Sequence, residues 1–424
     1  MTGRYKAYPE YKDSGADCWF DQVPNHWQIK RISYVAQLKS GDSIVSEQIE
    51  AVGDYPVYGG NGHRGYTKKF NHDGDYILIG RQGALCGNIN YGYGKFWASE
   101  HAVVVHPILD INFKWLGETL RAMDLNQYNV SAAQPGLAVA NITCLKVPYP
   151  SIDEQVKIAN FLDHETAKID TLITKQEQLI ELLKEKRQAV ISHAVTKGLN
   201  PDAPMKDSGV EWLGQVPEHW EVAPLKYLCT FSGGGTPSKE NLSYWTDGTI
   251  PWVSPKDMKI FRITKTQDYI TEKALLESST NLVAEGALLM VVRSGILQRN
   301  IPIAINDVKV TLNQDMKALR FNKRIDVEYA ANFILGNVAA LLLDWSKEGA
   351  TVESIEHEYL SNGQIPVPPL DEQQTIISEL EKSNQYFDQL EMKATAGIEL
   401  LKERKAALIS AAVTGKIDVR DWHA

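Results

Sequence analysis

"ELLKEKRQAVISHAV" spans Glu181–Val195, and "ELLKERKAALISAAV" spans Glu399–Val413. The likeness extends back to Val147 and Ile365, and every matched pair lies 218 residues apart. A constant offset over about fifty residues means that neither copy has gained or lost a residue, although loops tolerate insertions readily. A long helix in a register-dependent contact does not tolerate them. The repeat therefore predicts two long helices of matched register.

Helical signals run through both copies. Prolines precede each copy and end any strand before it, and Asp153 and Asp371 are placed to cap the helix starts. Gly198 and Gly415 can take the left-handed conformation that ends a helix. A rod of about 43 residues is about 65 Å long, and the other copy is the obvious partner for its single apolar stripe. The stripe of the first copy consists of Ile169, Leu172, Leu179, Leu183, Val190 and Ala194.

A shorter repeat precedes each half of the chain. "KDSGADCWFDQVPNHW" (Lys12–Trp27) returns as "KDSGVEWLGQVPEHW" (Lys206–Trp220). Large aromatic residues are usually buried, so we expect both terminal tryptophans to pack the linker onto the protein. The order of linker, body and long helix therefore occurs twice along the chain. The boundaries are an N-terminal linker at 1–27, a first body at 28–146, a first long helix at 147–198, the repeated linker at 199–220, a second body at 221–364, and a second long helix with the C-terminal tail at 365–424.

The two bodies do not align with each other in sequence. Each mixes strand candidates with helical stretches, which predicts two compact mixed α/β domains. The strand candidates are "DYILIG" at 75–80, "HAVVVHP" at 101–107, "GALLMVV" at 286–292 and "IPIAI" at 301–305. The helical stretches are "NFKWLGETLRAMD" at 112–124 and "VEYAANFILGNVAALLLDW" at 327–345.

Composition limits the classes of protein to consider. The formal charge is -9, from 44 basic and 53 acidic residues, which argues against coating nucleic acid by bulk electrostatics. No apolar run is long enough to span a bilayer, and the N-terminal stretch lacks the apolar core of a signal peptide. We therefore expect a cytoplasmic protein without a membrane partner. The four cysteines form no C-x-x-C pair, so neither a zinc site nor a disulfide framework is expected.

The doubled cassette resembles a known family. Openings "PYPSIDEQ" and "PVPPLDEQ" lead into rods that end "KRQAVISHAVTKG" and "RKAALISAAVTGK", and "SG…QVP.HW" linkers precede unlike bodies. This pattern is similar to the DNA-specificity subunit of type I restriction–modification systems, over essentially the whole chain.

That resemblance implies two target-recognition domains, each reading one half of a bipartite, asymmetric double-stranded DNA site. It implies that the rods pair as an antiparallel coiled coil, act as a ruler between the half-sites, and give the chain a pseudo-twofold axis. The partners would be two methyltransferase subunits that use S-adenosylmethionine, joined in some complexes by restriction subunits that use ATP with Mg²⁺.

Catalytic motifs are missing from the sequence. We find no N/D-P-P-Y/F methyltransferase motif, no phosphate-binding loop and no H-E-x-x-H zinc helix. Gly60, Gly62 and Gly65 satisfy G-x-G-x-x-G, but no apolar helix follows them, so a loop is expected there instead of a nucleotide site. The sequence therefore predicts no catalytic residue, no metal ligand and no cofactor site on this chain.

Polar residues beside glycines mark candidate DNA contacts in the first body. "GGNGHRGY" is expected to place an amide, an imidazole and a guanidinium on one exposed turn, and Asn and Arg are readers of adenine and guanine. "IGRQG" follows a strand candidate directly, and glycine lets backbone approach a phosphate closely. A plain turn, a surface salt bridge and a solvated lysine pair are the competing interpretations. The candidates are Asn61, His63, Arg64, Lys68, Arg81, Gln82 and Gln134.

The second body offers similar chemistry. "SGGGTPSKENLSYW" could cradle a backbone phosphate, and "WVSPKDMK" places polar groups on a turn. "VVRSGILQRN" parallels the Arg81 loop, because a strand candidate again precedes an arginine and a glycine. The candidates are Ser238, Lys239, Ser254, Lys256, Arg293, Gln298 and Arg299.

A different class of function also fits the acidic charge. The chain could be a coiled-coil scaffold whose two bodies bind proteins. Neither body is a basic patch by composition, so we expect tight DNA binding only together with a partner that supplies positive charge.

Overall fold

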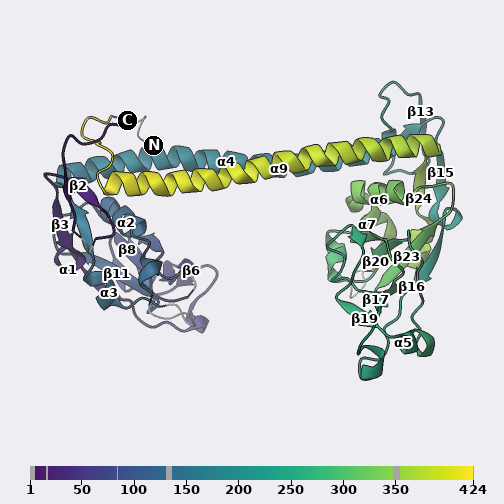
Figure 1. Ribbon diagram of the computed structural model, residues 1–424, viewed down its shortest axis with the longest axis horizontal. Helices are drawn as coiled ribbons and strands as arrows, with labels where there is room; N and C mark the ends of the chain where they lie inside the picture. Colours follow the sequence, from purple (N-terminus) through teal and green to yellow (C-terminus); the bar gives the residue numbers. More distant parts are fainter. Residues whose placement is uncertain (1–4, 16–17, 84, 130–135, 347–353, 424) are drawn as a thin grey trace. The chain divides into compact units, whose positions relative to one another are not determined.

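The computed structural model describes residues 5–15, 18–83, 85–129, 136–346 and 354–423 (Figure 1). The chain forms two units: residues 1–177 with 395–424 make unit 1, and residues 178–394 make unit 2. Two long helices, α4 (Ile152–Lys197) and α9 (Leu370–Val413), contribute residues to both units. They have 46 and 44 residues, which confirms the long helices predicted from the repeat.

The ends of these helices match the prediction better than their starts do. Gly198 and Gly415 follow the helices with φ of 78° and 76°, a conformation that only glycine adopts at little cost. Asp153 and its counterpart in α9 lie inside the first helical turn, so the prediction that they cap the helices is wrong. In α4 the cap is Ser151, whose hydroxyl accepts a hydrogen bond from the backbone N–H of Glu154 at 3.3 Å.

Within unit 1 the two long helices run antiparallel. Asp170 of α4 pairs with Lys405 of α9 at 2.6 Å. Thirteen residues earlier along α4, Lys157 donates to the backbone oxygen of Arg420, which lies beyond the end of α9. Residues earlier in α4 therefore contact residues later in α9 and in the segment after it, as expected for antiparallel helices.

Unit 2 repeats this arrangement. Arg187 of α4 donates to Asp388 of α9 at 2.5 Å, and these two residues are the repeat counterparts of the ion pair in unit 1. Further along α4, Gly198 lies beside Glu372 near the start of α9. The same contact at counterpart positions is what a pseudo-twofold frame requires.

The predicted apolar stripe is buried only in part. Ile169 and Ala194 are 5% and 3% exposed, within the cores of unit 1 and unit 2 respectively. Leu172 and Leu179 are 45% and 42% exposed, so the prediction that they are buried is wrong. A pair of helices covers one narrow seam, and these side chains lie outside it.

Body 1, residues 28–146, is built on two four-stranded sheets. The strands predicted at 75–80 and 101–107 are confirmed as β8 (Tyr76–Gly80) and β11 (Ala102–Pro107), neighbours in the main sheet, whose order is β4-β11-β8-β9. The second sheet has the order β6-β5-β10-β7. The remaining strands of the two sheets are β4 (Ala36–Ser40), β9 (Ile89–Gly92), β5 (Tyr55–Gly59), β6 (Gly62–Thr67), β7 (His72–Asp73) and β10 (Lys95–Ala98).

Body 2, residues 221–364, has a five-stranded sheet in the order β16-β23-β20-β21-β18 and a smaller sheet β19-β17-β22. The strands predicted at 286–292 and 301–305 are confirmed as β20 (Leu288–Val291) and β21 (Ile303–Asn306). The remaining strands are β16 (Cys229–Gly233), β17 (Ile250–Val253), β18 (Arg262–Ile263), β19 (Asp268–Ile270), β22 (Thr311–Leu312) and β23 (Met316–Phe321).

The two bodies share one sheet plan although their sequences differ. In both main sheets all neighbouring strands of the shared core are antiparallel, and β4, β11, β8 and β9 take the places of β16, β23, β20 and β21. Both smaller sheets contain one parallel pair, β5 with β10 and β17 with β22. The divergence of the bodies therefore lies in side chains and loops, on a common backbone.

Each body also contains helices. The stretch predicted at 112–124 forms α2 (Phe113–Ala122). The stretch at 327–345 is two helices, α6 (Val327–Gly336) and α7 (Val338–Trp345), bent by 90° at Asn337. The shorter helices are α1 (Ile32–Val35), α3 (Val139–Thr143), α5 (Glu272–Glu277) and α8 (His357–Asn362), with 3₁₀ turns η1 (Ser46–Gln48), η2 (Leu125–Tyr128), η3 (Leu225–Tyr227), η4 (Leu242–Tyr244) and η5 (Gly295–Gln298).

Each body is closed by a two-stranded pair where the chain enters and leaves it. β3 (Gln28–Arg31) pairs with β12 (Lys146–Tyr149) in body 1, and β15 (Glu221–Pro224) pairs with β24 (Gln364–Val367) in body 2. The linkers form hairpins, β1 (Tyr11–Asp13) with β2 (Gln22–Pro24), and β13 (Met205–Asp207) with β14 (Gln215–Pro217).

A carboxylate at the start of each long helix fixes the linker tryptophan. Trp27 and Trp220 are 1% and 0% exposed, which confirms the prediction that they pack. The indole N–H of Trp27 donates to Glu154 at 3.2 Å, and that of Trp220 donates to Glu372 at 3.0 Å. His26 also contacts Glu154, and burial opposed by these hydrogen bonds leaves the pKa of the Glu154 carboxyl below its ordinary value.

The glutamine that follows each anchoring glutamate fixes the body. The side-chain oxygen of Gln155 accepts from the N–H of Asn112, the residue that caps α2, at 2.9 Å. The side-chain oxygen of Gln373 accepts from the N–H of Asp326, which caps α6, at 2.8 Å. Both glutamines are 0% exposed, so the repeated D-E-Q motif joins linker, body and long helix at one point in each unit.

Unit 1 is closed by the described segments that begin at Tyr5 and end at His423, which lie side by side (Figure 1). The N–H of Asp418 donates to the backbone oxygen of Lys6 at 2.7 Å, and Lys6 pairs with Asp421 at 3.1 Å. In unit 2 the corresponding region is a continuous segment that runs from α4 into β13.

Two properties of the described part of the chain concern membranes and metal ions. No single helix there is long and apolar enough to cross a bilayer, and the only pair that passes by length and composition is the bent pair α6 and α7, much of which lies in the core of unit 2. Among those residues no group of three or more His, Cys, Asp or Glu could hold a metal ion.

Candidate nucleic-acid interface

In body 1 the backbone fixes Arg81 and Gln82 at the end of β8. The N–H of Arg81 donates to the oxygen of His101 at 2.8 Å, and its own oxygen accepts from Leu137 at 2.9 Å. Gln82 forms a β-bridge with Gly136 and its side chain is exposed. The Arg81 guanidinium donates to the hydroxyl of Ser40 at 3.2 Å. These contacts present two polar side chains on a rigid edge.

The turn between β5 and β6 reaches the same edge. Asn61 lies in this turn and accepts a hydrogen bond from Asn88 at 3.3 Å. A Cβ on Gly80 would lie 2.0 Å from the oxygen of Gly60, so only glycine permits the approach. A Cβ on Gly60 would lie 2.8 Å from the oxygen of Gln82. The structure therefore brings together the predicted residues of the two loops.

His63 and Arg64 lie elsewhere than predicted. Both belong to strand β6 and are exposed there, so the expectation of one turn that carries all three polar groups is wrong. The His63 ring lies 4.8 Å from the ring of Tyr66, and the Arg64 side chain covers Gly59. The turn is shorter than expected because β6 begins at Gly62.

The other predicted residues of body 1 carry less information. Lys68 is exposed just after β6 and lies 3.6 Å from Glu50, an exposed pair of small energetic value. Gln134 lies outside the described residues.

Body 2 presents an edge with the same backbone contacts. The N–H of Val292 donates to the oxygen of Asp315 at 2.8 Å, and its oxygen accepts from Ile355 at 2.8 Å. Arg293 forms a β-bridge with Ser354, and its side chain is exposed.

These contacts establish which residues of the two edges are counterparts. Val292 makes the backbone bonds that Arg81 makes in body 1, and Arg293 makes the bridge that Gln82 makes. The sequence predicted that Arg81 and Arg293 occupy equivalent positions, but the backbone places Arg293 at the position of Gln82. The predicted correspondence is therefore wrong by one residue. Sequence alone could not reveal this, since the side chains differ at every counterpart position.

A glycine beside each edge was predicted in only one body. A Cβ on Gly234 would lie 1.9 Å from the oxygen of Asn313, and one on Gly41 would lie 2.1 Å from that of Ala98. Gly234 belongs to the Gly-rich segment that the sequence singled out, whereas Gly41 was missed because a single glycine in "KSGDS" gives no comparable signal.

The remaining candidates in body 2 are exposed, except for Ser254. Ser238, Lys239 and Lys256 are exposed on loops, and Gln298 and Arg299 are exposed at and after η5. Ser254 is 6% exposed, and its hydroxyl donates to Asp257 at 3.0 Å. Its side chain holds the turn, which is at odds with the prediction that it contacts DNA.

Residues that sequence reasoning missed surround Arg293. Gln314, Lys317 and His357 line a hollow with it, together with Glu356. They come from β23, the loop before it and α8, so no local motif could have grouped them.

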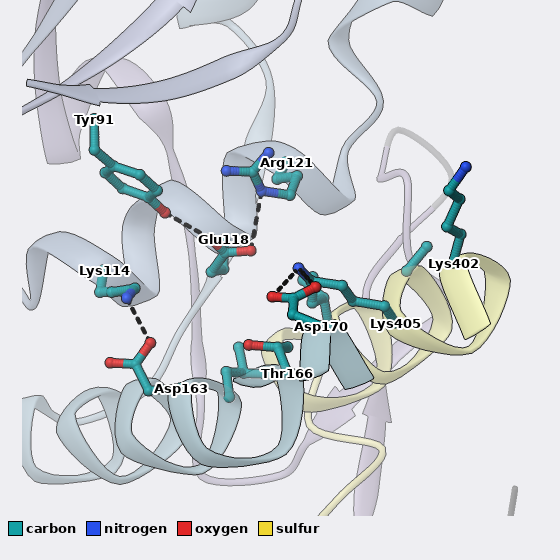
Figure 2. A pocket seen from close by; sticks show the side chains of 12 residues that line it. Tyr91, Lys114, Glu118, Arg121, Asp163, Thr166, Asp170, Lys402 and Lys405 are labelled. Carbon is teal, nitrogen blue, oxygen red and sulfur yellow. Dashed lines mark hydrogen bonds and ion pairs between the residues drawn. The ribbon is translucent and has the colours of Figure 1, made fainter. Parts of the chain in front are cut away.

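Figure 2 shows contacts inside body 1 and one ion pair that joins body 1 to α4. Glu118 of α2 is 8% exposed, accepts from the Tyr91 hydroxyl at 2.7 Å, and pairs with Arg121 at 3.1 Å. Lys114 of α2 pairs with Asp163 of α4 at 2.5 Å. Burial and the Glu118 charge raise the pKa of the Tyr91 hydroxyl, so it remains a donor.

Comparison with known proteins agrees with this architecture. The family model "Type I restriction modification DNA specificity domain" matches residues 24–182 and 217–400. The chain belongs to this family. The two matches contain the two bodies and most of the two long helices, so each half of the repeated frame corresponds to one copy of the family domain.

Curated relatives of this specificity family include two from Escherichia coli. The EcoprrI specificity subunit is 44% identical over 40% of this chain and 42% of the relative, and the EcoR124I/EcoR124II specificity subunit is 34% identical over 61% and 60%. These matches thus span about half the length of those relatives. A solved structure from work on assembly and conformational transition of the type I R-M system covers 93% of this chain and 99% of its own, with a TM-score of 0.68 at 14% identity. That likeness concerns the fold.

Proposed function

We propose that this chain is the non-catalytic DNA-specificity subunit of a type I restriction–modification complex. Each body would read one half of a bipartite, asymmetric double-stranded DNA site. The observation that carries the proposal is the pair of equivalent edges, which present different polar side chains on one backbone plan. Recognition of two unlike half-sites requires a repeated backbone frame whose base-contacting residues differ between the two copies.

The proposed partners are two methyltransferase subunits that use S-adenosylmethionine, and restriction subunits that use ATP with Mg²⁺ where the complex also cleaves DNA. The repeated ion pair, Asp170 with Lys405 and Asp388 with Arg187, supports two identical partners, because it gives them counterpart surfaces. The long helices would set the gap between the half-sites. The complex would act in the cytoplasm.

A protein-binding scaffold is the other candidate, and the family match does not favour it. The scaffold hypothesis rested on the net charge of -9, which a basic partner would offset.

A genome-wide map of adenine methylation, with and without the gene, tests the proposal. We expect one bipartite motif with a fixed gap to lose methylation when the gene is deleted. An unchanged map in a strain whose methyltransferase co-purifies with this chain would contradict the proposal.

A further inference from the structure

A hollow in unit 2 lies where α4 ends and α9 begins. Its volume of about 360 Å³ is at the low end of the range for ligand-binding cavities. Val190, Ala194 and Leu380 give it an apolar floor, whereas Glu379 and Ser383 give it a polar rim. We call it the α4–α9 hollow.

The repeat shows what covers the counterpart surface in unit 1. Phe161 and Glu165 of α4 are the counterparts of Glu379 and Ser383. The ring of Tyr5 lies 5.3 Å from that of Phe161, and its hydroxyl donates to Glu165 at 2.7 Å. Trp422 lies 5.5 Å from Phe161 on another side. Two aromatic side chains from the flanking segments therefore cover the place that is hollow in unit 2.

Among the described residues of unit 2, no tyrosine or tryptophan lines the hollow. Leu199 takes the place of Tyr5, since each precedes the lysine of its own K-D-S-G motif by seven residues. Leu199 is 42% exposed beside the hollow. Val190 is half-buried on the hollow floor, whereas its counterpart in unit 1, Leu408, is 3% exposed. Unit 1 thus has two aromatic side chains at this place, whereas no tyrosine, tryptophan or phenylalanine ring lines the hollow in the described part of unit 2.

We propose that the α4–α9 hollow receives an aromatic side chain, a tyrosine or a tryptophan, presented by a methyltransferase subunit. A ring with one polar group suits an apolar floor with a polar rim, as Tyr5 illustrates in unit 1. Buried tyrosine and tryptophan side chains also carry much of the binding energy of protein interfaces. The inference rests on the proposed function, because it names the partner that this function requires.

The test fills the hollow from within the chain. In Leu199→Trp, the new indole would occupy the hollow as Tyr5 covers its counterpart, and would exclude the partner's ring. We expect the full chain with this substitution to bind one of its two methyltransferase subunits at least about tenfold more weakly, a difference of about 1.4 kcal/mol. Native mass spectrometry of the chain titrated with purified methyltransferase measures it.

Met392→Trp is the matched control, because Met392 is 65% exposed on α9 in unit 2 and does not line the hollow. We expect it to bind both subunits as the wild type does. Unchanged binding by Leu199→Trp would overturn the inference. Failure of the wild-type chain to bind any methyltransferase would instead contradict the proposed function.

A photo-crosslinking residue at Leu199 gives a second measurement that does not depend on the tryptophan variant. We expect crosslinks to a methyltransferase peptide that contains a tyrosine or tryptophan. Crosslinks only to a second copy of this chain, with a dimer that Leu199→Trp abolishes, would assign the hollow to that copy and overturn the inference.

Discussion

At the scale of single residues, the most informative pair is Gln82 and Arg293. Both are exposed, and both are fixed by a β-bridge at the same backbone position of their bodies. Glutamine pairs with adenine and arginine with guanine in the major groove. If these edges contact DNA bases, Gln82 and Arg293 are the positions at which the two bodies select different bases.

We therefore expect Gln82→Ala and Arg293→Ala each to weaken the sequence specificity at one base pair, in different half-sites. A good bidentate contact contributes about 1–3 kcal/mol of discrimination, so the substitution should allow several-fold more methylation at near-cognate sites. Methylome sequencing of each variant measures this. Lys68→Ala is the control, and we expect it to change no base preference; relaxation of the same position by all three variants would contradict the assignment.

Histidine protonation gives a residue-scale prediction in body 1. Burial and the nearby His106 lower the pKa of His72, and burial lowers that of His106. The folded state then binds fewer protons than the unfolded state, so stability falls as pH drops below about 6.5, the unfolded value. Thermal melts between pH 7.5 and 5.5 should show this loss, smaller in His72→Phe, which keeps a ring against Phe96. The same pH dependence in both proteins would contradict it, and His423→Asn is the control.

At the scale of elements, the linker anchors lead to a comparison between the two units. Glu154 accepts hydrogen bonds from Tyr8, His26, Trp27 and the Ser151 hydroxyl, whereas among the described residues Glu372 accepts them from His219 and Trp220. Removal of either carboxylate leaves a buried indole N–H without its acceptor, which costs about 1–3 kcal/mol.

We expect Glu154→Ala to destabilise its unit more than Glu372→Ala does, because two more donors, the hydroxyls of Tyr8 and Ser151, lose their acceptor. Urea unfolding followed by tryptophan fluorescence measures both. Glu185→Ala, at an exposed position of α4, is the control. An equal loss in both variants would mean that Tyr8 and Ser151 add nothing to this anchor.

The elements also show what sequence could predict. The long helices, β8, β11 and the burial of Trp27 follow from periodicity, from β-branched runs and from the size of the indole, all of which are local signals. The partner of Trp27 could not be predicted, because Glu154 lies 127 residues further along the chain and is one of many acidic residues. The equivalence of Arg293 with Gln82 could not be predicted either, because it is defined by backbone hydrogen bonds that do not depend on residue identity.

At the scale of the whole molecule, the helices give a prediction about spacing. A heptad inserted in both α4 and α9 keeps their register and adds about 10 Å, or about three base pairs of B-DNA. We expect the gap of the methylated motif to lengthen by about that amount with both half-sites unchanged. Methylome sequencing reads both. An unchanged gap would show that the helices are not a ruler, and insertion of seven residues between Pro201 and Asp202, which are exposed and do not line the α4–α9 hollow, is the control.

The net charge leads to a second prediction at this scale. With a formal charge of -9, the chain alone should bind its site weakly at physiological salt, and addition of the methyltransferase should tighten binding by orders of magnitude. Fluorescence anisotropy with a labelled duplex measures both. Nanomolar affinity of the isolated chain in 150 mM salt would contradict this prediction.

Because residues 395–424 complete unit 1, the half of the protein that is made first is finished last. The nascent body 1 leaves the ribosome without Leu408, Ala412 and Val419, which its core needs. The first part of unit 1 ends at Glu177, and at about 5–20 residues per second the remaining chain takes roughly 12–50 s to translate. During that time unit 2 can fold as one continuous segment, while the apolar surface of unit 1 that Leu408, Ala412 and Val419 cover stays exposed until translation has passed Val419.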